Sequence, residues 1–166
     1  MTRALHMRWL VLAVCVASAC GPSEPAAEPP VRDAEAWLEA VERAHVTADT
    51  EPASQASAAL SMALATPVPR DVLAMHRRVV HQDLLFRLAR AELDGGRPAD
   101  ALAATERGLA LGQQPDVFTA NLQLARGEAL EALGRAAEAA SAYFEALEIN
   151  RKILHHVLDA QDAGPP

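Results

Sequence analysis

Small residues recur at matched positions in the second half of this 166-residue chain, and this recurrence constrains the fold most. Glycine and alanine are required where two helices cross closely, because a larger side chain would hold the backbones apart. Each copy reads as a helix, a glycine turn and a second helix. The chain is therefore predicted to form closely packed helical hairpins. At an offset of 38 residues, the matched positions are Gly96 with Gly134, Ala101 with Ala139, and Gly108 with Ala146.

Composition supports a wholly helical protein. Alanine, the best helix former, is abundant, aromatic residues are only 4% of the chain, and strand-like alternation is rare. We predict an all-α fold of antiparallel helical hairpins over residues 33–160, followed by a tail over 161–166. Thr50 is the expected N-cap of the second helix. The six predicted helices are 34–45, 51–65, 71–93, 98–111, 116–133 and 135–159.

The stretch 132–150 (ALGRAAEAASAYFEALEIN) resembles the tetratricopeptide repeat, with copies at about 82–113 and 120–151. The second copy matches the pattern at Gly127, Leu130, Gly134, Ala139, Tyr143 and Ala146. The first copy matches at Leu85, Leu88, Ala89, Gly96, Ala101 and Gly108. The resemblance implies a short α-solenoid that binds another protein and carries out no catalysis.

Several positions depart from the repeat pattern. Glu92 and Thr105 replace large apolar residues in the first copy, and Gln123 replaces an aromatic residue in the second. The offset of 38 exceeds the usual 34, so we expect a longer loop around 113–117. An unrelated antiparallel bundle remains the alternative. Residues 33–65 are a candidate for a degenerate third pair, since about three units are needed to bury a continuous face.

If the repeats are real, the resemblance implies a binding groove along the first helix of each unit. The alternative is that Phe86 and Leu124 are ordinary core residues. The candidate partner-binding residues are Phe86, Arg90, Asn121, Leu124 and Glu128.

The start of the chain has the features of an export signal. Arg3 and Arg8 precede an apolar run at 9–19, whose eleven residues reach only about 17 Å as a helix, too short to span a bilayer. The run ends in Ala17-Ser-Ala-Cys20, which resembles the lipobox of bacterial lipoproteins, although leucine is preferred where Ala17 stands. The resemblance implies that Cys20 receives a lipid anchor. Cleavage after Ala19 that leaves a free thiol is the alternative.

The segment after Cys20 predicts a tether. Residues 20–32 are rich in proline, which disfavours helix and favours extended chain. Gly21 follows the cysteine, and by resemblance to enterobacterial lipoproteins this lacks the inner-membrane retention signal. We therefore expect attachment to the outer membrane, facing the periplasm.

Charge and motifs argue against other classes of function. A net charge of −7 makes nucleic acid an unfavourable partner. No nucleophile, phosphate-binding or metalloprotease motif occurs, so we expect no enzyme and no cofactor.

His76 and His81 are five residues apart, which does not suit a shared metal, and His155 and His156 point to different faces. We expect the arginines of the third helix to pair with nearby acids on a solvated face: Arg70, Arg77, Arg78, Arg87 and Arg90.

Together these features predict an envelope protein, anchored to the membrane by its N-terminal lipid, that binds another envelope protein. One alternative is a small structural subunit without a groove. The other is an enzyme or ligand-binding protein.

Overall fold

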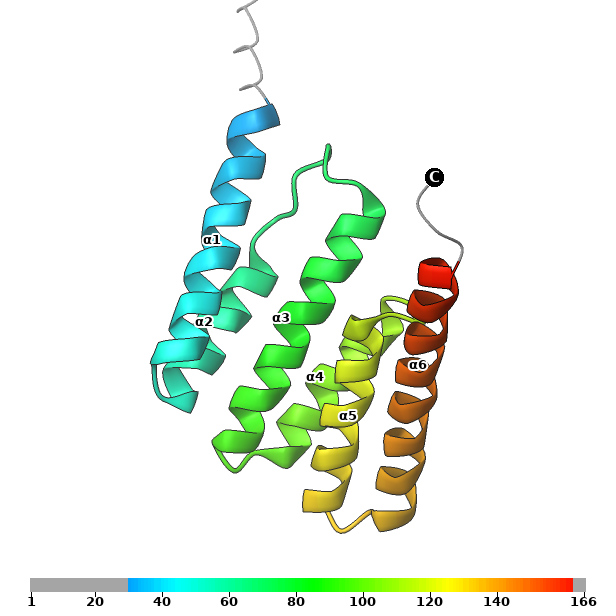
Figure 1. Ribbon diagram of the computed structural model, residues 1–166. Coiled ribbons are helices and arrows are strands. Elements are labelled where there is room, and N and C mark those ends of the chain that lie inside the picture. The colour runs from blue at the N-terminus through cyan, green and yellow to red at the C-terminus, as the bar shows by residue number, and fades with distance from the viewer. Residues whose placement is uncertain (1–29, 163–166) are drawn as a thin grey trace, which may run out of the picture.

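The computed structural model describes residues 30–162, which form six α-helices in three antiparallel hairpins placed side by side (Figure 1). No strand occurs in this range, and the predicted all-α fold of six helices in hairpins is confirmed. Each helix contacts the next one along the chain, so the three hairpins form a single array. The helices are α1 (Pro30–Thr50), α2 (Ala53–Ala65), α3 (Ala74–Asp94), α4 (Pro98–Ala110), α5 (Val117–Ala132) and α6 (Ala136–Asp162).

The first helix is longer at both ends than the sequence predicted. It begins at Pro30, inside the predicted tether, because proline in a first helical turn lacks only an N–H that has no partner there. It continues five residues past His45 to Thr50. Thr50 is not the N-cap of α2: its hydroxyl donates to the carbonyl of Val46 in its own helix. Pro52 stands at the start of α2 instead, without a side-chain cap.

The other helix boundaries differ from prediction by a few residues. The third helix begins at Ala74 rather than at residue 71, and α6 extends through residues 161–162 of the predicted tail to Asp162. The predicted export signal at 1–19, Cys20 and residues 20–29 of the tether lie outside the described residues. Residues 163–166 do so as well.

Two glycine turns connect the helices of the second and third hairpins in the same way. Gly96 and Gly134 have φ angles of 70° and 74°, which an L side chain rarely adopts. The N–H of the following arginine reaches back over the turn, from Arg97 to the carbonyl of Glu92 and from Arg135 to that of Leu130, each at 2.8 Å. This 6→1 bond closes both helix ends.

Small buried residues recur seven positions apart on the second helix of every hairpin. The pairs are Ala56 and Ala63 on α2, Ala101 and Gly108 on α4, and Ala139 and Ala146 on α6, and all are buried. The first hairpin therefore has the same pattern of close helix packing as the other two. Residues 33–65 belong to this third unit, although their sequence departs from the repeat pattern.

Candidate interaction surface

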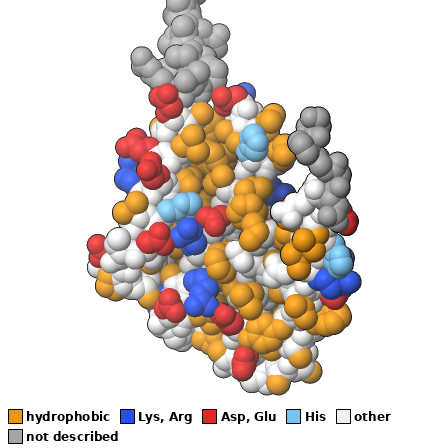
Figure 2. Space-filling model, viewed as in Figure 1, with side chains coloured by type: hydrophobic (Ala, Val, Ile, Leu, Met, Phe, Trp, Pro, Cys, Tyr) orange, Lys and Arg blue, Asp and Glu red, His pale blue; other side chains and the backbone are white. Residues whose placement is uncertain are grey.

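The first helices of the hairpins, α1, α3 and α5, form one layer of the array, which we call the inner layer. Contacts join α1 to α3 and α3 to α5, whereas within residues 30–162 none joins α2 to α4 or α4 to α6. Because the helices of this layer are the more closely spaced, the array is concave on their side. Figure 2 shows this face, with hydrophobic side chains gathered over its upper part and basic and acidic groups side by side below.

Ion pairs join neighbouring helices of the inner layer. Arg90 on α3 pairs with Glu128 on α5, and Arg78 on α3 pairs with Asp116 at the start of α5 at 2.9 Å. Both pairs span 38 residues, so α3 and α5 lie side by side with the register of the sequence repeat. Arg87 pairs with Asp49 and Asp83 at 2.8 and 3.1 Å. The expectation that these arginines pair with nearby acids is confirmed for Arg78, Arg87 and Arg90.

All five candidate partner-binding residues lie on the inner layer. Leu124 on α5 has 44% of its surface exposed, and Asn121, one helical turn earlier, is half-buried. Phe86 on α3 is also half-buried and packs against the core. Arg90 and Glu128 bind each other, so a partner would meet a paired charge there rather than two free ones.

A hollow of about 280 Å³ lies where the end of α1, the start of α2 and α3 meet. Phe86 and Arg90 line it together with Asp49, Glu51 and Arg87. Two of the five candidate residues therefore face this hollow, whereas Asn121 and Leu124 are not among its lining residues. The structure divides the predicted groove residues between two parts of the concave layer.

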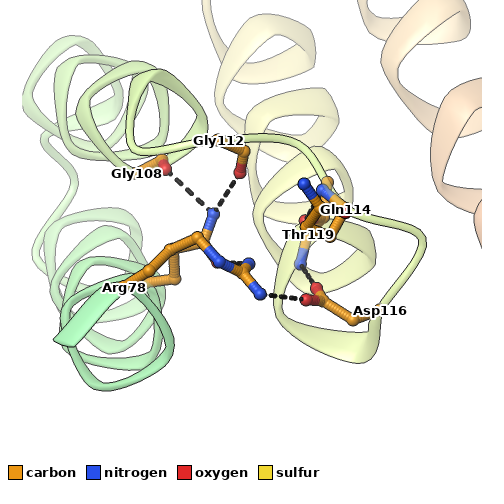
Figure 3. A network of polar contacts seen from close by, with 7 residues as sticks. Arg78, Gly108, Gly112, Gln114, Asp116 and Thr119 are labelled. Atoms are coloured by element: carbon orange, nitrogen blue, oxygen red, sulfur yellow. Dashed lines mark hydrogen bonds and ion pairs between the residues drawn. The ribbon is translucent and has the colours of Figure 1, made fainter. Parts of the chain in front are cut away.

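A buried polar network, which sequence reasoning missed, fixes α5 against α3 and α4 (Figure 3). The Gln82 side chain has no exposed surface, and its Nε2 donates to the carbonyls of Gly108 and Gly112 at 3.1 and 2.7 Å. Its Oε1 accepts from Arg78 at 2.6 Å. The network also holds the start of the loop between α4 and α5, because the carbonyl of Gly112 there is one of the acceptors.

Asp116 extends the network to the first turn of α5. Its Oδ2 accepts from Arg78, and its Oδ1 accepts from the backbone N–H of Thr119 at 2.9 Å, which makes Asp116 the N-cap of α5. Burial by itself would raise the pKa of Asp116, but the hydrogen bonds from Thr119 and Arg78 hold that pKa below its ordinary value. The sequence did carry a signal for this N-cap: an Asp stands at the predicted start of the helix, three residues before a Thr.

Glu92 and Thr105, the two polar departures of the first copy, are buried but satisfied. Glu92 is 7% exposed, accepts from Ser57 on α2 and pairs with Arg97 after the glycine turn. Thr105 donates to the carbonyl of Leu102, three residues earlier, at 2.8 Å. The side chains that the repeat pattern would have made apolar thus have partners, one of them, Ser57, supplied by the neighbouring hairpin.

Close steric fit is the main feature of the contact between α5 and α6. A Cβ atom at Gly127 would overlap the ring of Tyr143 on α6, so only glycine leaves room for this aromatic side chain. The Tyr143 hydroxyl donates to Glu131 at 2.8 Å. Burial, followed by the nearby Glu131 carboxylate, raises the pKa of Tyr143 to about 12. Gly108 fits in the same manner under Leu122, whose methyl carbons would lie 2.7 Å from an added Cβ.

The described residues present helix faces and ion pairs rather than a cluster of reactive groups. Between Pro30 and Asp162, no three His, Cys, Asp or Glu side chains are placed to hold a metal ion. Burial and the nearby Arg77 lower the pKa of His81. None of the six helices combines the length and the apolar character needed to cross a bilayer.

The fold and this surface define a class of protein, an all-α array of three helical hairpins with one concave layer. Comparisons with protein-family models, with curated proteins and with solved structures found no match to this chain.

Proposed function

We propose that this chain is a lipid-anchored protein of the bacterial cell envelope that binds another envelope protein without catalysis. The observation that carries the proposal is the concave layer of α1, α3 and α5. The layer presents half-exposed Leu124 on α5 and half-buried Phe86 on α3, and the Arg90–Glu128 pair links these two helices. The resemblance of 132–150 to the tetratricopeptide repeat, whose members bind partners on this layer, supports the proposal.

The docking mode that fits this surface is a helix or extended peptide laid across α3 and α5. Ion pairs fix the two helices in register, so the surface is preorganised and little conformational entropy is lost on binding. Apolar contact with Leu124 and Phe86 would supply affinity.

The groove is tested on Leu124, whose exposure lets it be changed without disturbing the core. A photo-reactive amino acid at position 124 should cross-link one envelope protein in cells, and Leu124→Glu should abolish co-purification of that same protein. The matched control is position 62 on α2, where Met62 is 73% exposed on a helix outside the inner layer. A photo-reactive amino acid at position 62 should not cross-link the partner, and Met62→Glu should not reduce its binding.

The structural-subunit alternative predicts the opposite result. If Met62→Glu releases the partner while Leu124→Glu leaves it bound, the outer helices form the contact and the groove proposal is wrong. Circular dichroism and thermal melting of both variants would establish that each one is folded.

The membrane anchor is tested separately on Cys20. The apolar run and the lipobox-like end at 17–20 support acylation of this residue, and Gly21, by resemblance to enterobacterial lipoproteins, supports attachment to the outer membrane. Labelled palmitate should enter the wild-type chain and the Cys15→Ser variant equally, because Cys15 lies inside the predicted signal. Cys20→Ser should lose the label. Label retained in Cys20→Ser would contradict the anchor, whatever the result at Leu124.

A further inference from the structure

The last helix has one long face that nothing in the array covers. It packs against α5 alone and is 27 residues long, whereas α5 has 16. Four large apolar side chains on it are exposed: Phe144 by 61%, Leu147 by 62%, Leu154 by 57% and Leu158 by 46%. A contiguous exposed apolar face of this kind marks an interaction surface.

These side chains follow the spacing of a helix–helix seam. Together with Ala140 and Arg151 they occupy positions 140, 144, 147, 151, 154 and 158, which alternate steps of four and three residues over three heptads. Steps of this size keep one stripe facing a second helix along its whole length. We call this stripe the α6 seam.

The preceding hairpin shows what such a face does when a helix covers it. Leu109 on α4 is 9% exposed because α5 follows and packs over it. Leu147 stands at the equivalent position, 38 residues later, but no further helix follows α6 within the described residues. Leu147 on the α6 seam is therefore the counterpart of a covered residue, and within the described residues it lacks that cover.

Charge along α6 indicates which helix fits. Glu145 and Glu148 lie before the midpoint of the seam, whereas Arg151, Lys152 and His155 lie at or after it, with Asp159 as the one acid beside the seam in that half. An antiparallel copy of α6 would place the acidic half of one chain against the basic half of the other. With the two-fold axis at Arg151, Phe144 faces Leu158 of the second copy, Leu147 lies beside its Leu154, and Glu148 lies beside its His155.

We propose that two copies of this chain pair through antiparallel α6 seams. Such an interface is isologous, so each apolar and charged contact occurs twice. The two Arg151 side chains meet near the axis, where Glu148 of each chain, 2.8 Å from Arg151 in its own helix, offsets their repulsion. An anionic lipid surface fits less well, because Glu145 and Glu148 lie next to the seam. This pairing does not depend on the proposed groove or on the lipid anchor.

Disulfide cross-linking tests both the pairing and its direction. In the full chain with Cys15 and Cys20 changed to serine, Arg151→Cys should form a disulfide-linked dimer under mild oxidation, since the axis brings the two copies of position 151 together. Ala140→Cys lies on the same seam and is equally exposed. In an antiparallel pair its counterpart is about 22 residues, or roughly 33 Å, away, so it should stay monomeric. Cross-linking at both 140 and 151 would show a parallel pair, in which every seam position faces its own counterpart, and would overturn the proposal.

Sedimentation equilibrium of the cysteine-free full chain in density-matched detergent measures the affinity. The unmodified seam should give twice the chain mass of 17.7 kDa. Leu154→Glu should raise the dissociation constant roughly 100-fold, because each substitution acts twice in a symmetric interface. Arg151→Leu should lower it roughly tenfold by removing the like charges at the axis. Met62→Glu, on exposed surface away from the seam, should change nothing.

A monomer at all concentrations would overturn the proposal, and so would a dimer that survives Leu154→Glu. Binding of the monomer to phosphatidylglycerol vesicles, lost in Leu154→Glu, would assign the seam to a lipid surface instead and would equally overturn it.

Discussion

The second and third hairpins are built on one repeat, yet different interactions hold them. In α3 and α4, three buried polar side chains are hydrogen-bonded: Gln82 to α4 and the loop after it, Glu92 to α2, and Thr105 to a carbonyl of its own helix. In α5 and α6, the equivalent positions 38 residues later are Ala120, Leu130 and Tyr143, where steric fit dominates and one hydrogen bond remains, from Tyr143 to Glu131. The central hairpin has a hairpin on each side, and the one before it supplies Ser57 to Glu92, whereas within the described residues the last hairpin has a neighbouring hairpin on one side only. One backbone arrangement therefore accepts two kinds of interior.

The packing of Gly127 against Tyr143 offers the most direct way to interchange the two interiors. The second hairpin has Ala89 and Thr105 where the third has Gly127 and Tyr143. Tyr143→Thr should destabilise the protein by about 2–3 kcal/mol, because it empties the space beside Gly127. Gly127→Ala alone should cost about 1–2 kcal/mol, since the clash outweighs the gain in helix propensity.

The double variant Gly127→Ala/Tyr143→Thr should be more stable than Tyr143→Thr alone by up to about 1 kcal/mol, so the coupling is about 2 kcal/mol. Urea denaturation of the four proteins measures this cycle. If the losses in unfolding free energy of the two single variants simply added up in the double variant, the side chains at positions 127 and 143 would not be coupled, and the idea that they change together would be wrong.

Gln82 tests the polar interior of the central hairpin. Gln82→Leu should cost about 2–3 kcal/mol, because the carbonyls of Gly108 and Gly112 and the guanidinium of Arg78 each lose a partner. Thermal melting measures the loss, and hydrogen exchange should rise first in the loop at 111–116. The matched control is Ala120→Ser, at the equivalent buried position of α5, where no network exists. If hydrogen exchange in the loop at 111–116 were equally slow in the Gln82→Leu and Ala120→Ser variants, the result would argue against the network.

Asp116 distinguishes the capped start of α5 from the start of α3, where Leu73 provides no side-chain cap. Asp116→Ala should cost about 1 kcal/mol. Because the folded pKa of Asp116 lies below its unfolded value, its contribution is complete above about pH 4 and is lost as pH falls through the folded pKa.

Asp116→Asn keeps a good capping side chain but has no carboxylate to protonate. Its stability should therefore depend less on pH between about pH 4 and 2 than that of the wild type. Denaturation midpoints across this interval measure the difference. Identical acid profiles would show that the Arg78–Asp116 contact carries no charge dependence.

The Arg90–Glu128 pair should have the smallest effect, although it connects the same two helices. Its side chains are 44% and 34% exposed, and exposed ion pairs contribute about 0.5 kcal/mol or less. Arg90→Gln should leave the melting temperature nearly unchanged, and 0.5 M salt should abolish any difference. A large loss of stability would mean that surface charge, rather than the buried network, joins α3 to α5.

Local patterns were sufficient for the existence of the helices and for most of their turns. Gly96 and Gly134 indicated turns because left-handed φ angles favour glycine, and the periodicity of apolar residues indicated six helices. The extension of α1 at both ends was missed because Pro30 and Thr50 were read as boundaries, whereas a helix accepts proline in its first turn and threonine in its last. The candidate residues Phe86 and Leu124 could be assigned to one layer, but not to one groove.

By itself, the sequence determined the all-α class, the hairpins and the close approach of helices at alanine and glycine, because these follow from backbone sterics and from spacing within a few turns. Only the tertiary structure decided that Gln82 and Glu92 are buried with hydrogen-bonding partners. It also decided that no helix within residues 30–162 covers the α6 seam. Both outcomes depend on which distant helix or loop comes to lie beside a residue. No local pattern encodes that neighbour.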